Sequence, residues 1–436
     1  MTSYEIRTEI IQANAMGFGV HVLREPNEPR DLFVKIVDVA KYDHKTWTDV
    51  RRTLLYARTE IRFYDEFLPF LRKRMHDGWT IAPHCHLAMY DMNGLIDDGE
   101  MVVALPESEC GVEENGSDPP GWLDKKMRLE RGGVIVLDSL DVQTGFEISS
   151  SQLSTGVTGE CQTCNYLQES PITHTQASAC LDAVARLHAV TFKDKTLLKR
   201  VGERLAIYGG SYNLSIRNPK ELANIEQSWN AFVSAFSDAP SLPKGFFERE
   251  SIRTLGTRVK KMASYVSKEL SPRYDDDYAT LVHGDFKAMN VFLPNPASSD
   301  CSEMDKCQTT LIDFASSGVG LGMSDVAMHI AHAVHPRDLQ NGGEEALIDI
   351  YLTSLERSLP ARKKGAYPRK QAMRHYKLAS IDYLRFIMGR FWGSASLDLF
   401  EKRKKNKNTT LGNLYFTIIF IILGFSFCHL LINTFV

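Results

Sequence analysis

The stretch from His283 to Asn290 constrains this chain most, because it has the form His-x-Asp-x-x-x-x-Asn and Asp313 follows 23 residues later. The residues between Asn290 and Asp313 predict a short strand, a polar loop and a return strand, over 291–293, 294–308 and 309–314. A hairpin of this kind would place Asn290 and Asp313 side by side. Loop and hairpin together therefore predict a site where several oxygen-bearing side chains converge.

The spacing of these side chains is typical of phosphoryl-transfer sites. Asp285 is expected to orient or deprotonate an acceptor hydroxyl, while Asn290 and Asp313 are expected to bind Mg²⁺, a cation that prefers oxygen ligands. Lys287 could neutralise the transferring phosphate, and a solvated loop charge explains it equally well. Asp325 is interpreted as structural, as the N-cap of a helix.

The N-terminal part of the chain is predicted to be rich in strands, with one helix. Apolar residues over 31–39 predict a strand around Lys35, and apolar positions at three- and four-residue steps predict a helix over 47–74. A lysine inside an apolar strand is unusual, because a buried lysine is normally paired with an opposite charge or a ligand. Lys35 is expected to bind the phosphates of ATP and to pair with Glu60 on the next helix, and Asp65 is the nearest alternative partner. The alternative is a lysine that reaches solvent, with Glu60 on the helix surface.

Two weaker candidates for nucleotide binding lie in this part of the chain. Gly17 and Gly19 could let a backbone turn approach the phosphates, although an ordinary hairpin turn is an equal alternative. Asp138 lies where two lobes should join, so adenine would pair with backbone groups there, and a plain linker is the alternative. Further strands are expected at 86–90, 101–105 and 133–137.

The C-terminal part of the chain is predicted to be mainly helical, with the hairpin embedded in it. Helical spacing is found over 176–192, 221–236, 251–270, 344–359 and 369–392. His188 is expected to be a hydrogen-bonded core histidine. The expected organisation has four parts. They are a nucleotide-binding lobe (1–138), a helical lobe with the catalytic loop and metal site (139–400), a basic linker (401–413) and a tail (414–436).

The tail and the overall charge indicate whether the protein binds a membrane or nucleic acid. Residues 414–436 are apolar enough to span a bilayer, and the basic cluster 402–407 before them favours cytoplasmic catalytic lobes with a C-terminal membrane anchor. A buried or interfacial helix in a soluble cytoplasmic protein is the alternative. The net charge of −3 provides no global basic field, so a nucleic-acid partner is not expected. The oligomeric state stays unknown.

A zinc site is a competing interpretation of other residues. His84, Cys85, His86, Cys161 and Cys164 could supply ligands, but they lack the paired motifs of structural zinc sites. We therefore do not expect zinc.

The motifs resemble those of the aminoglycoside phosphotransferase and choline kinase superfamily. His283-Gly-Asp with Asn290, and Ile312-Asp313-Phe314, carry the resemblance. It is closest to the choline-kinase-like, ecdysteroid-kinase-like branch, which has segments similar to Glu60-Ile-Arg-Phe-Tyr, 134–146 and 185–188. The resemblance implies an α+β, bilobal protein-kinase-like fold and ATP-dependent phosphorylation of a small-molecule hydroxyl.

The chain departs from this branch at two places. Asp138 stands where glutamate is commoner, and Ala315 stands after Asp313-Phe314 where a glycine or second acidic residue is usual. The acceptor stays open among choline-, ethanolamine-, aminoglycoside- and sterol-like alcohols. Other hypotheses are a membrane-held, pseudokinase-like nucleotide-binding module and a protein kinase, although the A-P-E-like segment and HRD arginine of protein kinases are missing.

Overall fold

The computed structural model describes most of the chain between residues 5 and 398. The described residues are 5–7, 19–24, 31–42, 45, 47–75, 79–101, 128–129, 131–140, 142–144, 165–237, 244–296, 308–396 and 398. The strand expected at 101–105 and the tail expected at 414–436 lie outside them, apart from Met101. Within the described part, no helix combines the length and apolarity needed to cross a bilayer.

A five-stranded antiparallel sheet forms the N-terminal part, in the order β1-β2-β3-β5-β4. Its strands are β1 (Glu5–Arg7), β2 (Gly19–Arg24), β3 (Asp31–Asp38), β4 (Cys85–Asp91) and β5 (Gly132–Asp138). The strands expected at 31–39, 86–90 and 133–137 are therefore confirmed. Lys35 lies within the central strand β3, opposite Val20 of β2 and Ile135 of β5.

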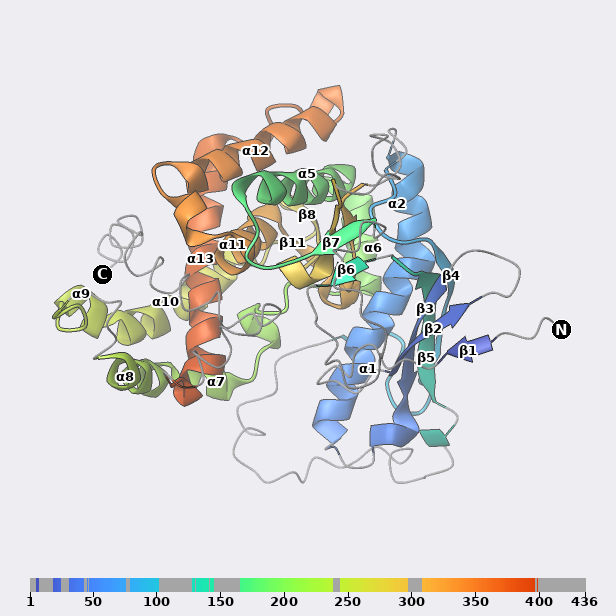
Figure 1. The fold of residues 1–436 in the computed structure, drawn as a ribbon, viewed down its shortest axis with the longest axis horizontal. Helices are drawn as coiled ribbons and strands as arrows, with labels where there is room; N and C mark the ends of the chain where they lie inside the picture. The colour runs from blue at the N-terminus through green and yellow to red at the C-terminus, as the bar shows by residue number, and fades with distance from the viewer. Residues whose placement is uncertain are drawn as a thin grey trace, which may run out of the picture.

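The helical segment expected over 47–74 is confirmed, but it is not a uniform α-helix. It consists of α1 (Trp47–Arg62), one π-helical turn (Phe63–Phe67) and α2 (Leu68–Arg74). Leu54, Ile61 and Leu71 are buried, as their spacing predicts. Figure 1 shows α1 lying along the five-stranded sheet, between the sheet and the helices of the C-terminal part.

Two smaller sheets carry the loop and the hairpin. One has the strand order β10-β9-β7-β6 and is built from β6 (Val142–Thr144), β7 (Tyr166–Gln168), β9 (Val291–Pro294) and β10 (Thr310–Leu311). The other pairs β8 (Ala279–Val282) with β11 (Gly318–Leu321) in antiparallel register. All residues of β8 and β11 are buried, so the loop 283–290, the expected catalytic loop, begins from a fully buried base.

Helices make up most of the C-terminal part, as expected. They are α5 (His174–Thr191), α6 (Lys195–Arg204), α7 (Pro219–Ala223), α8 (Ile225–Phe236), α9 (Glu250–Arg253), α10 (Leu255–Leu270), α11 (Gly322–Ala333), α12 (Gly343–Ser358) and α13 (Arg369–Phe391). The helical structure expected over 221–236 and 251–270 is confirmed, but neither stretch is a single helix. Each is divided, because ψ rises to −2° at Asn224 and 5° at Thr254 and interrupts the helical backbone.

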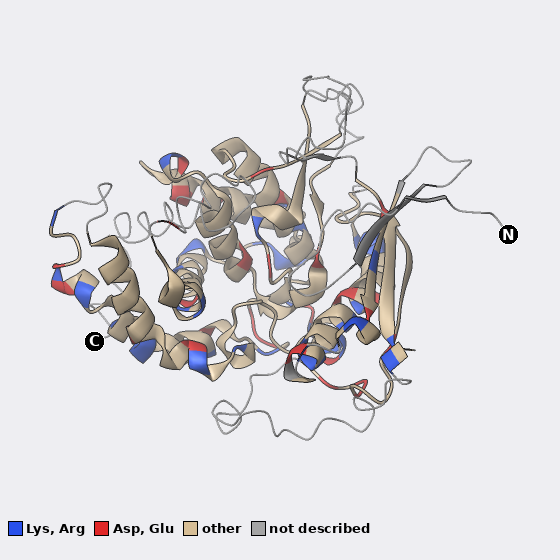
Figure 2. Ribbon diagram, turned by 60° about the horizontal axis from the view of Figure 1, so that its bottom comes forward, with Lys and Arg blue, Asp and Glu red and all other residues tan. Residues whose placement is uncertain are grey.

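Charged side chains are spread over both parts of the described structure. Figure 2 shows Lys and Arg interspersed with Asp and Glu along the helices, without a large region of one sign. This distribution agrees with the small net charge of the chain. The boundaries expected at 138/139 and 400/401 stay predictions.

Candidate functional site

The backbone of the catalytic loop is held by one buried carboxylate. Asp325 accepts hydrogen bonds from the backbone nitrogens of His283 and Gly284, at 2.7 and 2.9 Å. His188 Nε2 lies 3.1 Å from the same carboxylate, and its Nδ1 lies 2.9 Å from the Tyr351 hydroxyl. The expected role of His188 as a hydrogen-bonded core residue is thus confirmed.

The N-cap role expected for Asp325 is wrong, although its structural role is confirmed. Leu321 is the N-cap of α11, and Asp325 lies in the first turn. Its side chain turns towards the catalytic loop instead of its own helix, because the two loop amides would otherwise be buried without this acceptor.

Steric constraints explain why the middle residue of the His-Gly-Asp motif is a glycine. Gly284 has φ of +83°, a left-handed conformation that glycine adopts without strain. A Cβ at this position would collide with the backbone carbonyl oxygen of Ser316 and approach the Gly210 nitrogen to 2.8 Å. Glycine therefore lets the catalytic loop lie directly against two other chain segments.

Both carboxylate oxygens of Asp285 accept hydrogen bonds. Ser211 Oγ donates to Oδ1 over 3.2 Å, while Lys287 Nζ and Asn290 Nδ2 donate to Oδ2 over 2.7 and 3.2 Å. Burial by itself raises the pKa of Asp285, but Lys287, His283 and Ser211 outweigh it, so the pKa lies below its usual value. Asp285 is therefore an anion at neutral pH, which suits a group that attracts a hydroxyl proton.

The hairpin brings Asn290 and Asp313 together. Val291 of β9 is opposite Leu311 of β10, and the Ile312 nitrogen donates to the Asn290 carbonyl over 3.0 Å. The expected return strand over 309–314 is too long, since β10 covers only Thr310–Leu311. It ends there because Asp313 has the left-handed φ of 64° and a 3-10 turn, Phe314–Ser316, follows.

Lys35 joins the five-stranded sheet to this hairpin. Its Nζ lies 2.6 Å from Glu60 Oε2 on α1 and 3.9 Å from Asp313 Oδ1. Burial lowers the pKa of Lys35, but the carboxylates of Glu60 and Asp313 outweigh it and raise the pKa above its usual value. The geometry thus agrees with the expected Lys35–Glu60 pair, and the competitor Asp65 is exposed.

A second connection is aromatic and joins the π-helical turn after α1 to the residue that follows Asp313; the sequence did not reveal it. The rings of Phe63 and Phe314 stack with centroids 3.7 Å apart, and Tyr64 meets Phe314 edge-on. Phe314 follows Asp313 directly, so its apolar character after an acidic residue was the available signal.

The weaker candidates are less informative. Gly19 is the first residue of β2 and pairs with Ile36 of β3, while Gly17 lies outside the described residues. Asp138 ends β5, and its Oδ1 lies 2.7 Å from His86 Nε2. Cys161 and Cys164 also lie outside the described residues.

The residues at the hairpin fit a hard divalent cation. The Asn290 amide nitrogen is occupied by Asp285, which leaves the amide oxygen as its remaining polar atom. The Asp313 side chain is 32 % exposed, so its carboxylate is accessible from solvent. One amide oxygen and one carboxylate are oxygen donors of the type that Mg²⁺ takes together with nucleotide phosphates.

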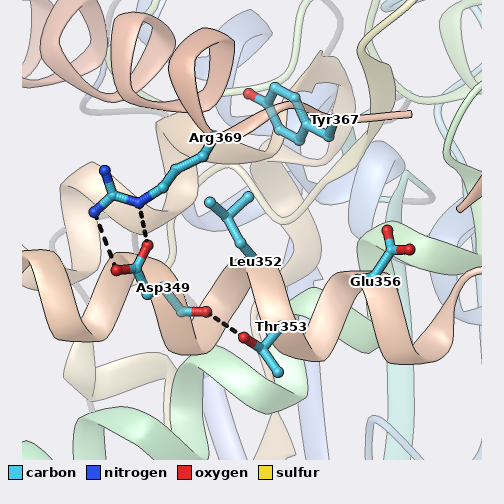
Figure 3. Close-up of a pocket in the computed structure, with 6 residues that line it drawn as sticks. All are labelled: Asp349, Leu352, Thr353, Glu356, Tyr367 and Arg369. Atoms are coloured by element: carbon cyan, nitrogen blue, oxygen red, sulfur yellow. Dashed lines mark hydrogen bonds and ion pairs between the residues drawn. The ribbon is translucent and has the colours of Figure 1, made fainter. Parts of the chain in front are cut away.

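A cavity of about 490 Å³ lies elsewhere, against α12 and the start of α13. Figure 3 shows two of its lining residues, Arg369 and Asp349, paired with each other. Arg369 Nε donates to Asp349 Oδ1 over 2.6 Å, and Nη2 donates to Oδ2 over 3.0 Å. None of the residues that line it, Asp349, Leu352, Thr353, Glu356, Tyr367 and Arg369, belongs to the loop or the hairpin. This cavity is therefore separate from the candidate site.

Comparison with known sequences supports the resemblance found in the motifs. Residues 165–363 match the sequence model of the Ecdysteroid kinase-like family, a range that includes the catalytic loop and the hairpin. The resemblance to the ecdysteroid-kinase-like branch is thus confirmed over that range. No curated protein matches the chain.

Three similar solved structures are an amicoumacin kinase bound to AMP-PNP and Ca²⁺, a macrolide 2'-phosphotransferase from Brachybacterium faecium and an ethanolamine kinase from Plasmodium vivax. Their sequence identities are 11%, 13% and 11%, and their TM-scores are 0.43, 0.38 and 0.36. The matches cover 96%, 94% and 97% of this chain and 90%, 91% and 84% of the others. TM-scores below 0.5 are too low to transfer the site of any of these proteins to this chain.

Proposed function

We propose that this chain is an ecdysteroid kinase-like phosphotransferase, which transfers the terminal phosphoryl group of ATP to a hydroxyl of a small molecule. One observation carries the proposal. Lys35 Nζ, itself paired with Glu60, lies 3.9 Å from Asp313, and the hairpin joins Asp313 to the loop that holds Asp285 and Asn290. Residues that the motifs single out, separated by up to 278 positions, thus converge on one place.

Lys35 would bind the phosphates of ATP, and Glu60 would hold its ammonium group in place. The ammonium group is buried, and its charge is held in place by Glu60 at 2.6 Å. A fixed cation in a poorly hydrated site stabilises phosphate charge more strongly than a cation in water. Glu60 supports this role by orienting the ammonium towards Asp313 and the nucleotide.

Asn290 and Asp313 would hold the magnesium that accompanies ATP. When bound, Mg²⁺ would neutralise charge on the phosphates and hold them in line with the acceptor. The residues of this chain contribute one amide oxygen and one carboxylate at the end of the hairpin.

Asp285 would orient the acceptor hydroxyl and accept its proton. The acceptor oxygen forms a bond to the terminal phosphorus, and the bond from that phosphorus to the bridging oxygen breaks, so ADP leaves with the electron pair. Lys287 Nζ lies 2.7 Å from Asp285 and so brings positive charge close to the reacting groups. Most of the acceleration in such a site comes from positioning and charge stabilisation.

The test measures ATP consumption by the purified full chain with Mg²⁺. The acceptors are choline, ethanolamine, an aminoglycoside and the polyhydroxylated steroid ecdysone, each with and without Asp285→Ala. We expect turnover that depends on both an acceptor and Asp285, with ATP binding nearly unchanged in the variant. Equal turnover by Asp285→Ala and the unaltered chain would overturn the assignment, and ATP binding without any transfer would favour a nucleotide-binding module.

A further inference from the structure

A segment that no motif marks lies directly against the catalytic loop. Gly209, Gly210 and Ser211 follow α6, and their backbone nitrogens donate to the carbonyl oxygens of Val319, Ser316 and Gly284 over 2.7, 3.0 and 2.7 Å. Three consecutive residues are therefore fixed by backbone bonds alone. One of the three acceptors is the glycine that precedes Asp285.

The two glycines explain how this segment comes so close. A Cβ at Gly209 would collide with the Val282 side chain and come within 2.8 Å of the Gly318 nitrogen. Gly210 has φ of +123°, which disfavours any residue with a side chain. Because Gly209 and Gly210 have no side chains, the segment packs closely enough for Ser211 to reach the loop 283–290.

The Ser211 side chain then meets the proposed catalytic carboxylate. Its Oγ donates to Asp285 Oδ1 over 3.2 Å, whereas Lys287 and Asn290 both donate to the other oxygen, Oδ2. Hydrogen bonds from two sides fix the rotation of a carboxylate about its last bond. Without Ser211, the Asp285 carboxylate would be held only through Oδ2 among these three contacts.

The hydroxyl of Ser211 is not needed to hold its own segment. The backbone nitrogen of Ser211 is already bonded to Gly284, and its carbonyl accepts from Arg217 Nη1 over 3.3 Å. The side-chain bond is therefore additional to a loop that is otherwise fixed.

We propose that Ser211 is a positioning residue for phosphoryl transfer, whose hydroxyl fixes the Asp285 carboxylate so that Oδ1 meets the acceptor hydroxyl. This inference rests on the proposed function. Ser211 acts through Asp285 and leaves the nucleotide residues Lys35 and Asp313 untouched. Its removal should therefore lower kcat and leave the KM for ATP unchanged.

The experiment compares Ser211→Ala, Ser211→Thr and Ser215→Ala in the full chain. It uses Mg-ATP with the member of the acceptor panel that gives Asp285-dependent turnover. Ser215 is a matched control, because it lies in the same connection but its Oγ donates to Asn213 Oδ1 over 2.7 Å and not to Asp285. Thermal unfolding of each variant shows whether the fold is retained.

We expect kcat of Ser211→Ala to fall roughly ten- to a hundredfold, the effect of losing one charge-assisted hydrogen bond in the transition state. Ser211→Thr keeps the hydroxyl and should recover most of the rate, and Ser215→Ala should match the unaltered chain. A rate for Ser211→Ala equal to that of the unaltered chain would overturn the positioning role alone. So would an equal loss in Ser211→Ala and Ser211→Thr with the same melting temperature as the unaltered chain.

Failure of the proposed function has a different signature. If the unaltered chain shows no Asp285-dependent transfer with any acceptor in the panel, both the function and the role of Ser211 are overturned. If the transfer depends on Asp285 and is indifferent to Ser211, the function stands and only the positioning role is lost.

Discussion

Phe63 and Phe314 stack face to face, with ring centroids 3.7 Å apart and planes 8° from parallel. Phe63 lies three residues after Glu60 on the helical segment, and Phe314 directly follows Asp313 on the hairpin. The stack therefore joins the helical segment that contains Glu60, the partner of Lys35, to the segment that contains Asp313, a proposed metal ligand. Both rings are fully buried.

Phe314→Ala should destabilise the protein by about 3–5 kcal/mol, because it removes a buried ring and leaves a cavity. Urea denaturation of the variant and of the unaltered chain measures the difference. Phe292→Ala, which truncates a half-buried ring on the neighbouring strand β9, should cost clearly less. Equal losses from the two variants would contradict the importance of the stack.

Glu60→Gln should weaken binding of Mg-ATP about tenfold, because a charge-assisted hydrogen bond that holds the Lys35 ammonium is lost. Isothermal titration calorimetry with a non-hydrolysable ATP analogue gives the dissociation constant. Asp65→Asn is the matched control, since Asp65 lies on the same helical segment and is exposed. A tenfold loss in the control, or none in Glu60→Gln, would speak against the pair.

Asp325→Asn should destabilise the protein by about 3 kcal/mol and lower kcat. The amide can present one oxygen, whereas the carboxylate now accepts from the two loop nitrogens through separate oxygens. Chemical unfolding and steady-state kinetics are the two measurements. Asp338→Asn is the control, because Asp338 is half-buried and accepts from the backbone nitrogen of His174 at the start of α5; it should change neither the stability nor kcat strongly. An unaltered kcat in Asp325→Asn would refute the anchoring role.

Glu66 provides a prediction about pH. Burial raises its pKa, but hydrogen bonds from Arg204 and Arg200 outweigh this and lower the pKa below its usual value. A lowered pKa in the folded state means that the stabilisation is present above the unfolded pKa of about 4.3 and is lost as the pH falls through the folded pKa. Glu66→Gln should therefore be less stable than the unaltered chain near neutral pH.

The stability difference for Glu66→Gln should narrow as the pH falls below about 4. Urea midpoints of both proteins across this range measure it. A difference that is constant with pH would show that packing, and not the charge of Glu66, is responsible. Glu203→Gln is a suitable control, because the Glu203 side chain is 61% exposed.

The sequence predicted those parts of the site that depend on local patterns. Lys35 and Glu60 were paired because a lysine in an apolar strand needs a partner, and phosphoryl-transfer sites provide a carboxylate from the next helix. Asn290 and Asp313 were paired because a hairpin brings its two ends together. In both cases the residues are near neighbours in the order of elements.

The contacts that the sequence did not predict join distant segments. Ser211 is 74 residues from Asp285, and His188 is 137 residues from Asp325. No period or motif links such positions, because their approach depends on how whole helices and sheets pack. The early end of the return strand was missed for a different reason, since no apolar pattern marks the left-handed conformation of Asp313.

The π-helical turn at Phe63–Phe67 changes the phase of the helix that carries Glu60. An α-helix advances about 100° per residue, so the additional residue in a wider turn rotates everything after it by about that angle relative to an unbroken helix. Glu60 meets Lys35 before this turn, whereas Phe67 and Leu71 are buried at its end and beyond it. Removing one residue from this turn would bring the two halves into a single register, and Glu60 and the apolar face beyond it could not both keep their contacts.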